Sequence, residues 1–371
     1  MPNGEMKMDI EADSDVRRFK NKQNNSECEP VRKMKSNDNS QNLKNINEMN
    51  QYLLEKGPKE LKRFTAIEYI GRGSESSVYK IRLNGTNKFY CLKLIQKKKR
   101  KINKNEYTIS TKIKSQYLAV VLYYYADKNS DFDYMIMELG SFDLSHFTRK
   151  IIRRNTLSES FLCLIAYQVL KGLSYLHMCK IAHLDIKAQN IIVTEYLDIK
   201  LIDFSVSLDY SKNKEEIILP YCGTPYYMSP EVMLQKRIKT KELQKVDLFS
   251  LGVTLYVLGF GRLPFGIIPG LKEVKDEELL EKMNSGWKVE NTNNIFSEHF
   301  INFLNGLLEV NINKRMDLEQ ALNSHFIKGA QLILDEKENI YNANSFLSNL
   351  ITDHIRTYQE FISNKSSSFL F

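Results

Sequence analysis

The pattern of apolar residues changes near residue 143, and this change limits the fold more than any other feature of the sequence. Before it, short runs rich in β-branched and aromatic residues alternate with Gly and Asn turns, which is typical of strands. We expect one helix at 102–113 and strands at 64–70, 78–83, 89–95, 118–125 and 134–137. After it, apolar residues recur at helical spacing. The sequence therefore predicts an α+β protein with a small β-rich lobe, a larger helical lobe and a ligand cleft between them.

The helical part is expected to begin at a capping box formed by Thr156 and Glu159. Behind it, Phe161, Ile165 and Val169 fall on one face of a helix. The longest uncharged run, at 248–261, is too short to cross a bilayer, so we expect it to be a buried helix. Further helices are predicted at 245–258, 272–283, 298–308 and 318–323.

The two ends of the chain differ from the lobes in composition. Residues 1–62 are rich in Asn, Lys, Ser, Glu and Asp and have little apolar surface to bury, which predicts a disordered tail. The two lobes then occupy 63–328, the first at 63–138 and the second at 141–328. Apolar residues in 329–371 follow a helical period, which predicts a helical extension that either packs on the larger lobe or binds a regulatory partner.

The net charge of +8 is a mild excess, with 53 basic and 45 acidic residues in 371. The densest basic run, Lys97–Lys101, has no interleaved aromatic residues for base stacking, so we expect no stable nucleic-acid binding. This run is interpreted as a solvated surface, with nuclear import or docking of an anionic regulatory partner as alternatives.

Five cysteines without disulfide or metal-ligand spacing indicate a reducing compartment. Residues 1–10 carry acids and no apolar stretch, so no signal peptide is expected. We therefore expect a cytoplasmic or nuclear protein without membrane association.

Two features of the first lobe bear on chemistry. Gly71 and Gly73 lie in a turn between two predicted strands, where backbone amides can approach phosphate oxygens. Lys93 lies inside an apolar strand and needs a partner there. Glu106, in the predicted helix, is the only acidic residue between Lys93 and Asp127 and is the expected partner.

Two loops of the second lobe carry acids. Asp185, Lys187 and Asn190 lie in one loop, and Asp203 follows a short strand in the next. Carboxylate and amide oxygens together with substrate phosphates suit Mg²⁺, so the two acids, with Asn190 near them, predict a site for a divalent cation.

In this order, these motifs resemble the signature of the eukaryotic protein kinase family. Further counterparts follow along the chain: Ser229-Pro230-Glu231, the apolar run beginning at Asp247, and Arg315, which matches the arginine that pairs with Glu231. The resemblance covers about residues 64 to 327. It implies a two-lobed kinase fold that transfers the γ-phosphoryl group of Mg-ATP to hydroxyl groups of protein substrates.

The resemblance also implies residue roles. Asp185 would accept the proton of the substrate hydroxyl, Lys187 would neutralise charge on the transferred group, and Lys93 would pair with Glu106 and hold phosphates. Met137 stands where the family places its gatekeeper residue, and 138–140 would be the hinge that binds adenine through backbone groups. The residues implied in ATP binding are Ile70, Gly71, Gly73, Val78, Lys93, Met137, Glu138, Gly140, Asn190 and Asp203. Of these, the resemblance implies Asn190 and Asp203 as the ligands of Mg²⁺.

Lys187 and Thr224 resemble the serine/threonine branch of the family. The combination of a non-Arg residue in His183-Leu184-Asp185 with Ile186-Lys187 also resembles the Wee-type kinases that act on tyrosine, so a tyrosine-directed or dual-specificity enzyme is an alternative. Phe204 stands where those kinases typically have Leu.

The chain departs from the family pattern at several positions. Leu184 replaces an Arg that often binds an activation-loop phosphate, and Pro220 stands where the phosphorylated residue often lies. We therefore expect activity without phosphorylation at that position. Other replacements are Ser76, Ser110 and Ser205; near Ser110, Ile109 and Ile113 are expected to supply the missing apolar packing. The alternative reading is a pseudokinase, a scaffold that does no chemistry.

Overall fold

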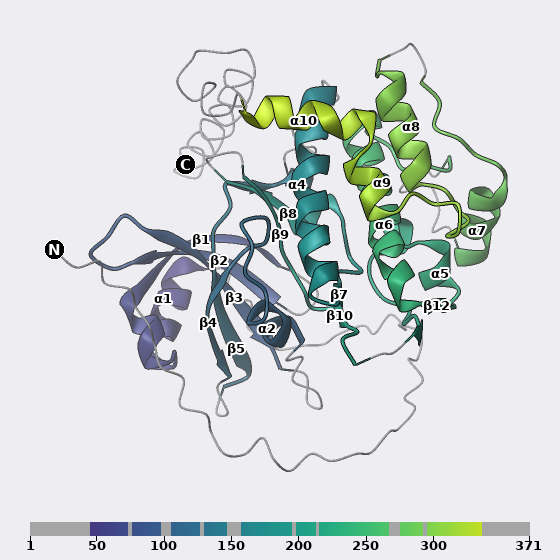
Figure 1. Ribbon diagram of the computed structural model, residues 1–371. Helices are drawn as coiled ribbons and strands as arrows, with labels where there is room; N and C mark the ends of the chain where they lie inside the picture. Colours follow the sequence, from purple (N-terminus) through teal and green to yellow (C-terminus); the bar gives the residue numbers. More distant parts are fainter. Residues whose placement is uncertain are drawn as a thin grey trace. The chain divides into compact units, whose positions relative to one another are not determined.

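The computed structural model describes residues 45–72, 76–97, 105–126, 130–146, 157–194, 198–212, 215–266, 275–291 and 295–335 (Figure 1). All of these residues belong to one of the two units into which the chain divides, Leu43–Phe371. Within that unit a lobe built on a β-sheet is followed by a lobe built on helices (Figure 1), as the change of pattern near residue 143 predicts.

The first lobe contains a five-stranded antiparallel sheet with the strand order β1-β2-β3-β5-β4. Its core is formed by alternate residues of neighbouring strands, including Ile81, Leu92 and Ile136. The elements are β1 (Phe64–Arg72), β2 (Ser76–Leu83), β3 (Phe89–Gln96), the short helix α2 (Asn105–Ser110), β4 (Val121–Ala126) and β5 (Phe132–Met137).

A helix precedes this sheet, and it corrects the prediction of a disordered tail over 1–62. The helix α1 (Ile46–Glu55) is capped by the Asn45 side chain and is followed by a 3₁₀ turn at Lys59–Arg63. Met49 and Leu53, four residues apart on one helix face, are fully buried against the sheet. The compositional argument failed because this one apolar stripe is enough to dock a short helix. Residues 1–44 lie outside the described part of the chain.

The side chain of Asn50 fixes α1 against β1. Its amide nitrogen donates to the Ala66 carbonyl at 3.0 Å, and its amide oxygen accepts from the Ala66 N–H at 2.7 Å. The helix therefore satisfies backbone groups of β1 and covers apolar surface of the sheet at the same time.

Replacing Leu53 with alanine is expected to lower the free energy of unfolding by about 2–3 kcal/mol, because it opens a cavity between α1 and the sheet. Urea denaturation followed by circular dichroism measures this loss. Leu54→Ala is the matched control, since Leu54 is 61% exposed. Equal stability of the two variants would show that α1 does not pack as described.

The second lobe is organised around two long helices, α4 (Glu159–Met178) and α6 (Leu243–Phe260). Segments that include these helices are long and apolar enough to cross a membrane by length and composition, but 67% and 78% of them are buried inside the protein. The uncharged run at 248–261 thus lies in a buried helix, as predicted. The other helices are α5 (Pro230–Met233), α7 (Asp276–Asn284), α8 (Glu298–Leu307), α9 (Leu318–Leu322) and α10 (His325–Asp335).

The start of α4 differs from the prediction of a Thr156–Glu159 capping box. Ser158 is the N-cap, and its side chain accepts a hydrogen bond from the Phe161 N–H. Glu159 instead accepts hydrogen bonds from the backbone and the hydroxyl of Ser297, the N-cap of α8. Glu159 therefore links α4 to α8. The spacing of residues along one helix cannot predict a contact with another helix.

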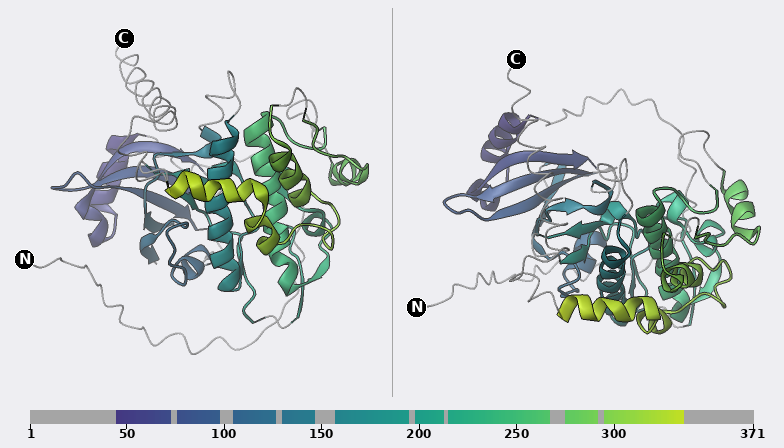
Figure 2. Two further views of the ribbon diagram at one scale, coloured as in Figure 1. Left: turned by 45° about the horizontal axis from the view of Figure 1, so that its top comes forward. Right: turned by 90° about the horizontal axis from the view of Figure 1, so that it is seen from above.

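The end of the described chain also corrects a boundary. The predicted border at residue 328 falls inside α10, which crosses α4 (Figure 2) and continues to Asp335. Residues 336–371 lie outside the described part, and their helical extension stays a prediction.

Short strands between the helices place the loops that carry the acidic residues. β8 (Ile191–Val193) pairs with both β6 (Phe142–Asp143) and β9 (Ile199–Leu201). β7 (Ile181–Ala182) pairs with β10 (Leu208–Asp209), and β11 (Glu216–Ile218) pairs with β12 (Arg237–Lys239). The loop after β7 therefore lies beside the loop that follows β9.

Candidate active site

A lysine and two carboxylates from three separate elements meet in the first part of the site. The Lys93 amine on β3 donates to both Glu106 oxygens at 2.8 Å and to Asp203 Oδ1 at 3.3 Å. The Lys93 and Glu106 side chains are only 12% and 5% exposed. The structure thus contains the predicted pair and adds Asp203 from the other lobe.

The charge states of this cluster follow from its geometry. Burial alone would lower the pKa of Lys93, but attraction to Glu106 and Asp203 outweighs it and holds the pKa above its usual value. Burial would likewise raise the pKa of Asp203, yet Lys93 and the Ser205 hydroxyl lower it overall. A protonated amine and an ionised carboxylate therefore face each other at neutral pH.

A second cluster is centred on Asp185. Its Oδ2 accepts from the Lys187 amine at 2.7 Å and from the Asn190 amide at 2.9 Å, and its Oδ1 accepts from the Thr224 hydroxyl at 2.7 Å. The Lys187 amine also donates to Thr224 Oγ1 at 2.7 Å. These contacts fix the carboxylate of Asp185, which the sequence predicts as the proton acceptor.

Asp247 on α6 holds the loop that carries Asp185. Its carboxylate accepts from the backbone N–H groups of His183 (3.0 Å) and Leu184 (2.8 Å) and contacts His177 Nε2 at 2.7 Å. Leu184 has a φ of 65°, which is unfavourable for a leucine, so these bonds offset the strain. Although Asp247 is fully buried, and burial raises a carboxyl pKa, hydrogen bonds from His177 and the loop hold its pKa below the usual range. Sequence reasoning noticed Asp247 only as the start of an apolar helix.

The predicted hinge residues adjoin a small apolar cluster. Met137 and Ile192 pack together with Ala119, flanked by Cys91. Gly140 lies so close to Ile192 that a Cβ at this position would come within 2.7 Å of the Ile192 Cβ. A side chain at position 140 would therefore displace Ile192, so the packing of this segment requires glycine.

The side chain of Glu138 forms an ion pair with Lys200 on β9. Its two oxygens accept from the Lys200 amine at 2.6 and 2.8 Å, and its backbone N–H donates to the Val120 carbonyl at 3.1 Å. Lys200 lies on β9, three residues before Asp203. This pair ties the hinge to the strand that positions Asp203. Sequence reasoning missed Lys200, because no local signal pairs two residues 62 apart.

The glycine turn is only partly described. Gly71 pairs with Val78 between β1 and β2, and Val78 pairs with Lys93 between β2 and β3. The register therefore brings these predicted nucleotide-binding residues onto neighbouring strands next to Lys93, while Ile70 is 48% exposed. Gly73 lies outside the described residues.

The residues present fit a magnesium ion held together with a phosphate. The described residues contain no group of three or more His, Cys, Asp or Glu side chains able to hold a metal. The Asn190 amide nitrogen is bonded to the carbonyl and carboxylate of Asp185, which leaves its amide oxygen as the atom able to ligate a cation. Asn190 and Asp203 would supply two oxygen ligands, a set that suits Mg²⁺ together with phosphate oxygens.

Ser110 stands where the family usually has an apolar residue, and buried apolar residues lie near it in the sequence. The Ser110 hydroxyl is buried and has no hydrogen-bond partner among the described residues. Ile109 and Ile113 are buried in the core beside it, as the sequence predicts.

Several contacts fix the described parts of the segment between Asp203 and Glu231, residues 204–212 and 215–230. Asp209 accepts from the Lys112 amine at 2.5 Å, and hydrogen bonds from Lys112 and Ser211 lower its pKa to about 2. β11 pairs with β12, and Leu219 after it is fully buried. The Tyr221 hydroxyl donates to Asp276 at 2.8 Å.

Comparison with known proteins agrees with this geometry. The chain matches the family described as "Protein kinase domain" over residues 64–327. It is 29% identical over 296 residues to serine/threonine-protein kinase dst2 of Dictyostelium discoideum, covering 77% of this chain and 24% of that protein. It is 36% identical over 179 residues to serine/threonine-protein kinase ppk25 of Schizosaccharomyces pombe, covering 48% of this chain and 39% of that protein.

A third relative is the MAP kinase kinase MKK1/SSP32 of Saccharomyces cerevisiae, 30% identical over 281 residues, with 72% of this chain and 53% of that protein covered. The matches thus span between about a quarter and a half of the relatives' lengths.

Proposed function

Because this chain belongs to the protein kinase family, we propose that it is an active enzyme that transfers the γ-phosphoryl group of Mg-ATP to serine and threonine hydroxyls of protein substrates. The observation that carries the proposal is the joint assembly of both clusters, Lys93–Glu106–Asp203 and Asp185–Lys187–Thr224. A scaffold that does no chemistry has no need to keep both clusters of charged side chains assembled.

Each of these residues would have a separate role in phosphoryl transfer. Lys93, held charged by Glu106, would bind phosphate oxygens, and Asp203 with Asn190 would hold the cation. Bound Mg²⁺ would neutralise negative charge on the phosphates. Asp185 would orient the substrate hydroxyl and take its proton, and Lys187 beside it would stabilise charge on the transferred group.

Serine or threonine is favoured as acceptor by the contacts of Lys187. Its amine bridges Asp185 and Thr224, so the two residues that resemble the serine/threonine branch both contact the expected proton acceptor. Tyrosine-directed or dual-specificity transfer is the second candidate, supported by the Leu at position 184.

Transfer of labelled phosphate from Mg-ATP to a degenerate peptide library tests the proposal. Libraries with Ser, Thr or Tyr as the single acceptor separate the specificities, and Asp203→Asn is the control for contaminating kinases. Equal signal from the wild-type protein and Asp203→Asn would favour the pseudokinase alternative.

Activity is expected to be independent of phosphorylation in the segment 205–221. Phosphatase-treated protein, and the double variant Ser211→Ala/Tyr221→Phe, should keep activity within about twofold, because ion pairs and strand pairing already order this segment. Ser207 and Tyr210 are buried and hydrogen-bonded, so they stay unchanged in this test. Loss of activity on dephosphorylation, restored by autophosphorylation, would contradict the expectation.

A further inference from the structure

The short helix that carries Glu106 needs support from contacts outside the Lys93 cluster. Helix α2 has six residues, Asn105–Ser110. An isolated helix shorter than about 12 residues is only marginally stable in water. Glu106, the second residue of α2, accepts from the Lys93 amine. The position of Glu106 therefore depends on contacts made by the rest of α2 and by the turn that follows it.

Lys112 lies in this turn and is joined firmly to the helix. The backbone N–H of Thr111 donates to the Tyr107 carbonyl at 3.0 Å, and the N–H of Lys112 donates to the Ile109 carbonyl at 2.9 Å. Ile109 and Ile113, which precede and follow the turn, are both buried in the same core. A displacement of the Lys112 backbone would therefore move α2 with it.

Asp209 belongs to a segment that is fixed to the helical lobe. It pairs with Ile181 where β10 lies beside β7 (Figure 1). The next residue, Tyr210, donates its N–H to the Lys180 carbonyl at 2.9 Å and its hydroxyl to the His177 carbonyl at 3.2 Å. The side chain of Tyr210 is buried. Asp209 is thus a fixed point of the helical lobe.

An ion pair joins Lys112 to Asp209. The Lys112 amine donates to Asp209 Oδ2 at 2.5 Å. Asp209 Oδ1 accepts from the Ser211 hydroxyl at 2.6 Å and from the Ser211 N–H at 3.0 Å. Both carboxylate oxygens are therefore held, which orients the side chain toward Lys112. The Lys112 and Asp209 side chains are 51% and 26% exposed, so the pair lies at the surface and outside the Lys93 cluster.

Helix α2 and the segment after Asp203 thus meet at two places. At the first, Lys93 binds both Glu106 and Asp203. At the second, Lys112 binds Asp209, and each lies six residues after the corresponding acid of the first contact. Six residues of helix advance about 9 Å, so the second contact acts on the same short element close to Glu106.

We propose that the ion pair between Lys112 and Asp209 positions Glu106 to bind Lys93. Lys112 and Asp209 are positioning residues, because they lie outside the residues expected to bind the nucleotide and the acceptor and act through Glu106. This inference rests on the proposed kinase function and names a contact that regulates its site. When the pair is broken, α2 loses a tie to the helical lobe and Glu106 is paired with Lys93 for less of the time.

The variants that test this proposal reverse the charges of the pair one at a time and together. They are Lys112→Glu, Asp209→Lys and the exchanged double variant Lys112→Glu/Asp209→Lys. Urea denaturation checks that each variant is folded.

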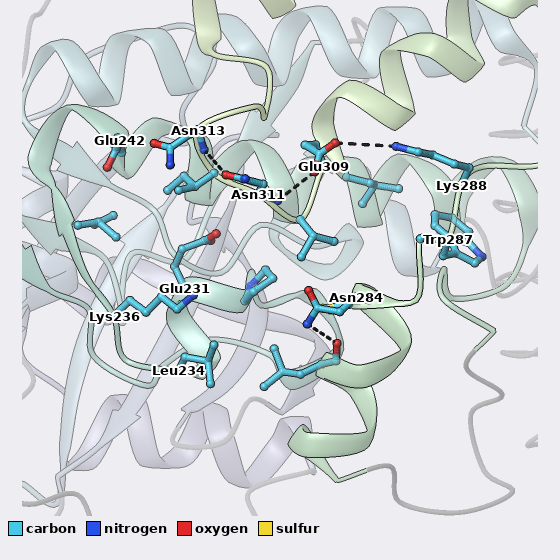
Figure 3. Close-up of a pocket in the computed structure, with 18 of the residues that line it drawn as sticks. Glu231, Leu234, Lys236, Glu242, Asn284, Trp287, Lys288, Glu309, Asn311 and Asn313 are labelled. Carbon is cyan, nitrogen blue, oxygen red and sulfur yellow. Dashed lines mark hydrogen bonds and ion pairs between the residues drawn. The ribbon is translucent and has the colours of Figure 1, made fainter.

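Two controls carry the same charge change elsewhere. In the first, Lys288→Glu, the Lys288 amine lies 3.8 Å from Glu309 at the edge of the cavity in Figure 3, and the two side chains are 65% and 26% exposed. This pair matches the exposure of the pair under test. The second control is Lys114→Glu, at another exposed position two residues from Lys112.

The first measurement needs no kinase activity. Acetylation of Lys93 by a limiting amount of acetic anhydride is followed by mass spectrometry in the nucleotide-free, full-length protein. Burial lowers the pKa of the Lys93 amine, whereas attraction to Glu106 and Asp203 raises it. Loss of Glu106 from the cluster therefore increases the neutral, reactive fraction of the amine. Glu106→Gln gives the reference rate for a cluster without this attraction.

The second measurement is kcat/KM for Mg-ATP at a saturating concentration of the best acceptor peptide from the library. Lys112→Glu is measured alone and combined with Glu106→Gln. A residue that acts through Glu106 should have little further effect once the charge of Glu106 is removed, whereas an unrelated structural effect would persist.

We expect each single variant of the pair to lower kcat/KM about fivefold and to raise the rate of Lys93 acetylation at least about threefold, because reversal replaces attraction with repulsion. The exchanged double variant should return both values to within about twofold of the wild-type protein, and Lys288→Glu and Lys114→Glu should stay within that range. In the Glu106→Gln background, Lys112→Glu should change kcat/KM by less than about twofold.

Unchanged acetylation of Lys93 in both single variants would overturn the proposal, as would an equal change in Lys288→Glu or Lys114→Glu. An exchanged double variant as impaired as the single variants would also overturn it. If no peptide is phosphorylated but acetylation responds as expected, the proposed function fails and the positioning of Glu106 stands. If peptides are phosphorylated and acetylation does not respond, the positioning proposal fails and the kinase function stands.

Discussion

Asp185→Asn is expected to lower kcat for peptide phosphorylation by about 10²- to 10⁴-fold, the usual contribution of a positioned proton acceptor. The amide offers one oxygen where the carboxylate accepts from Lys187, Asn190 and Thr224. Its NH₂ group would face one of these donors, so the loop would also lose the alignment of the substrate hydroxyl.

A measurement of ATP affinity distinguishes a loss of catalysis in Asp185→Asn from a general loss of structure. Lys93 and Asp203 lie outside the Asp185 cluster, so nucleotide binding by calorimetry should change less than about twofold while kcat falls. Asp131→Asn, at an exposed position in the loop before β5, is the matched control and should keep full activity. Near-normal kcat in Asp185→Asn would rule out Asp185 as the proton acceptor.

The order of the lobes and the paired lysine could be predicted because they follow from local signals. Alternating apolar runs indicate strands whatever their partners are, and the five strands of the sheet appear where the pattern places them. Lys93 needs a counter-charge in an apolar strand, and the described chain brings Glu106, the acid nearest in sequence, to it.

Contacts between distant elements could not be predicted from the sequence. Asp247 reaches back to residues 183 and 184 on another loop, and Lys200 reaches Glu138 on the hinge. Glu159 binds Ser297, the N-cap of α8, which lies 138 residues later. From the sequence alone, each of these residues looks like an ordinary surface or helix residue. Its role depends on which distant element packs against it.

The α1 helix was not predicted from the sequence, for a different reason. Residues 45–62 have the composition of the preceding tail, and only Met49, Leu53 and Leu61 distinguish them. Average composition predicts disorder, whereas three well-placed apolar side chains on an existing sheet are enough for order.

The largest effect on stability is expected at Arg315, which is fully buried with Glu231. Its guanidinium donates to both Glu231 oxygens and to the carbonyls of Glu309, Val310 and Lys245. Arg315→Ala leaves a buried carboxylate and these carbonyls without their donor, so the free energy of unfolding should fall by about 3–5 kcal/mol.

Urea denaturation measures this loss, and Lys282→Ala provides the comparison. Lys282 pairs with Glu278 at 3.5 Å on the surface of α7, where about 0.5 kcal/mol or less is expected. The contrast follows from burial, since water can replace the partner of the exposed Glu278, whereas the side chain of Glu231 is only 4% exposed. A loss below about 1 kcal/mol for Arg315→Ala would mean that water enters the site, and the pair would then be no more stabilising than one on the surface.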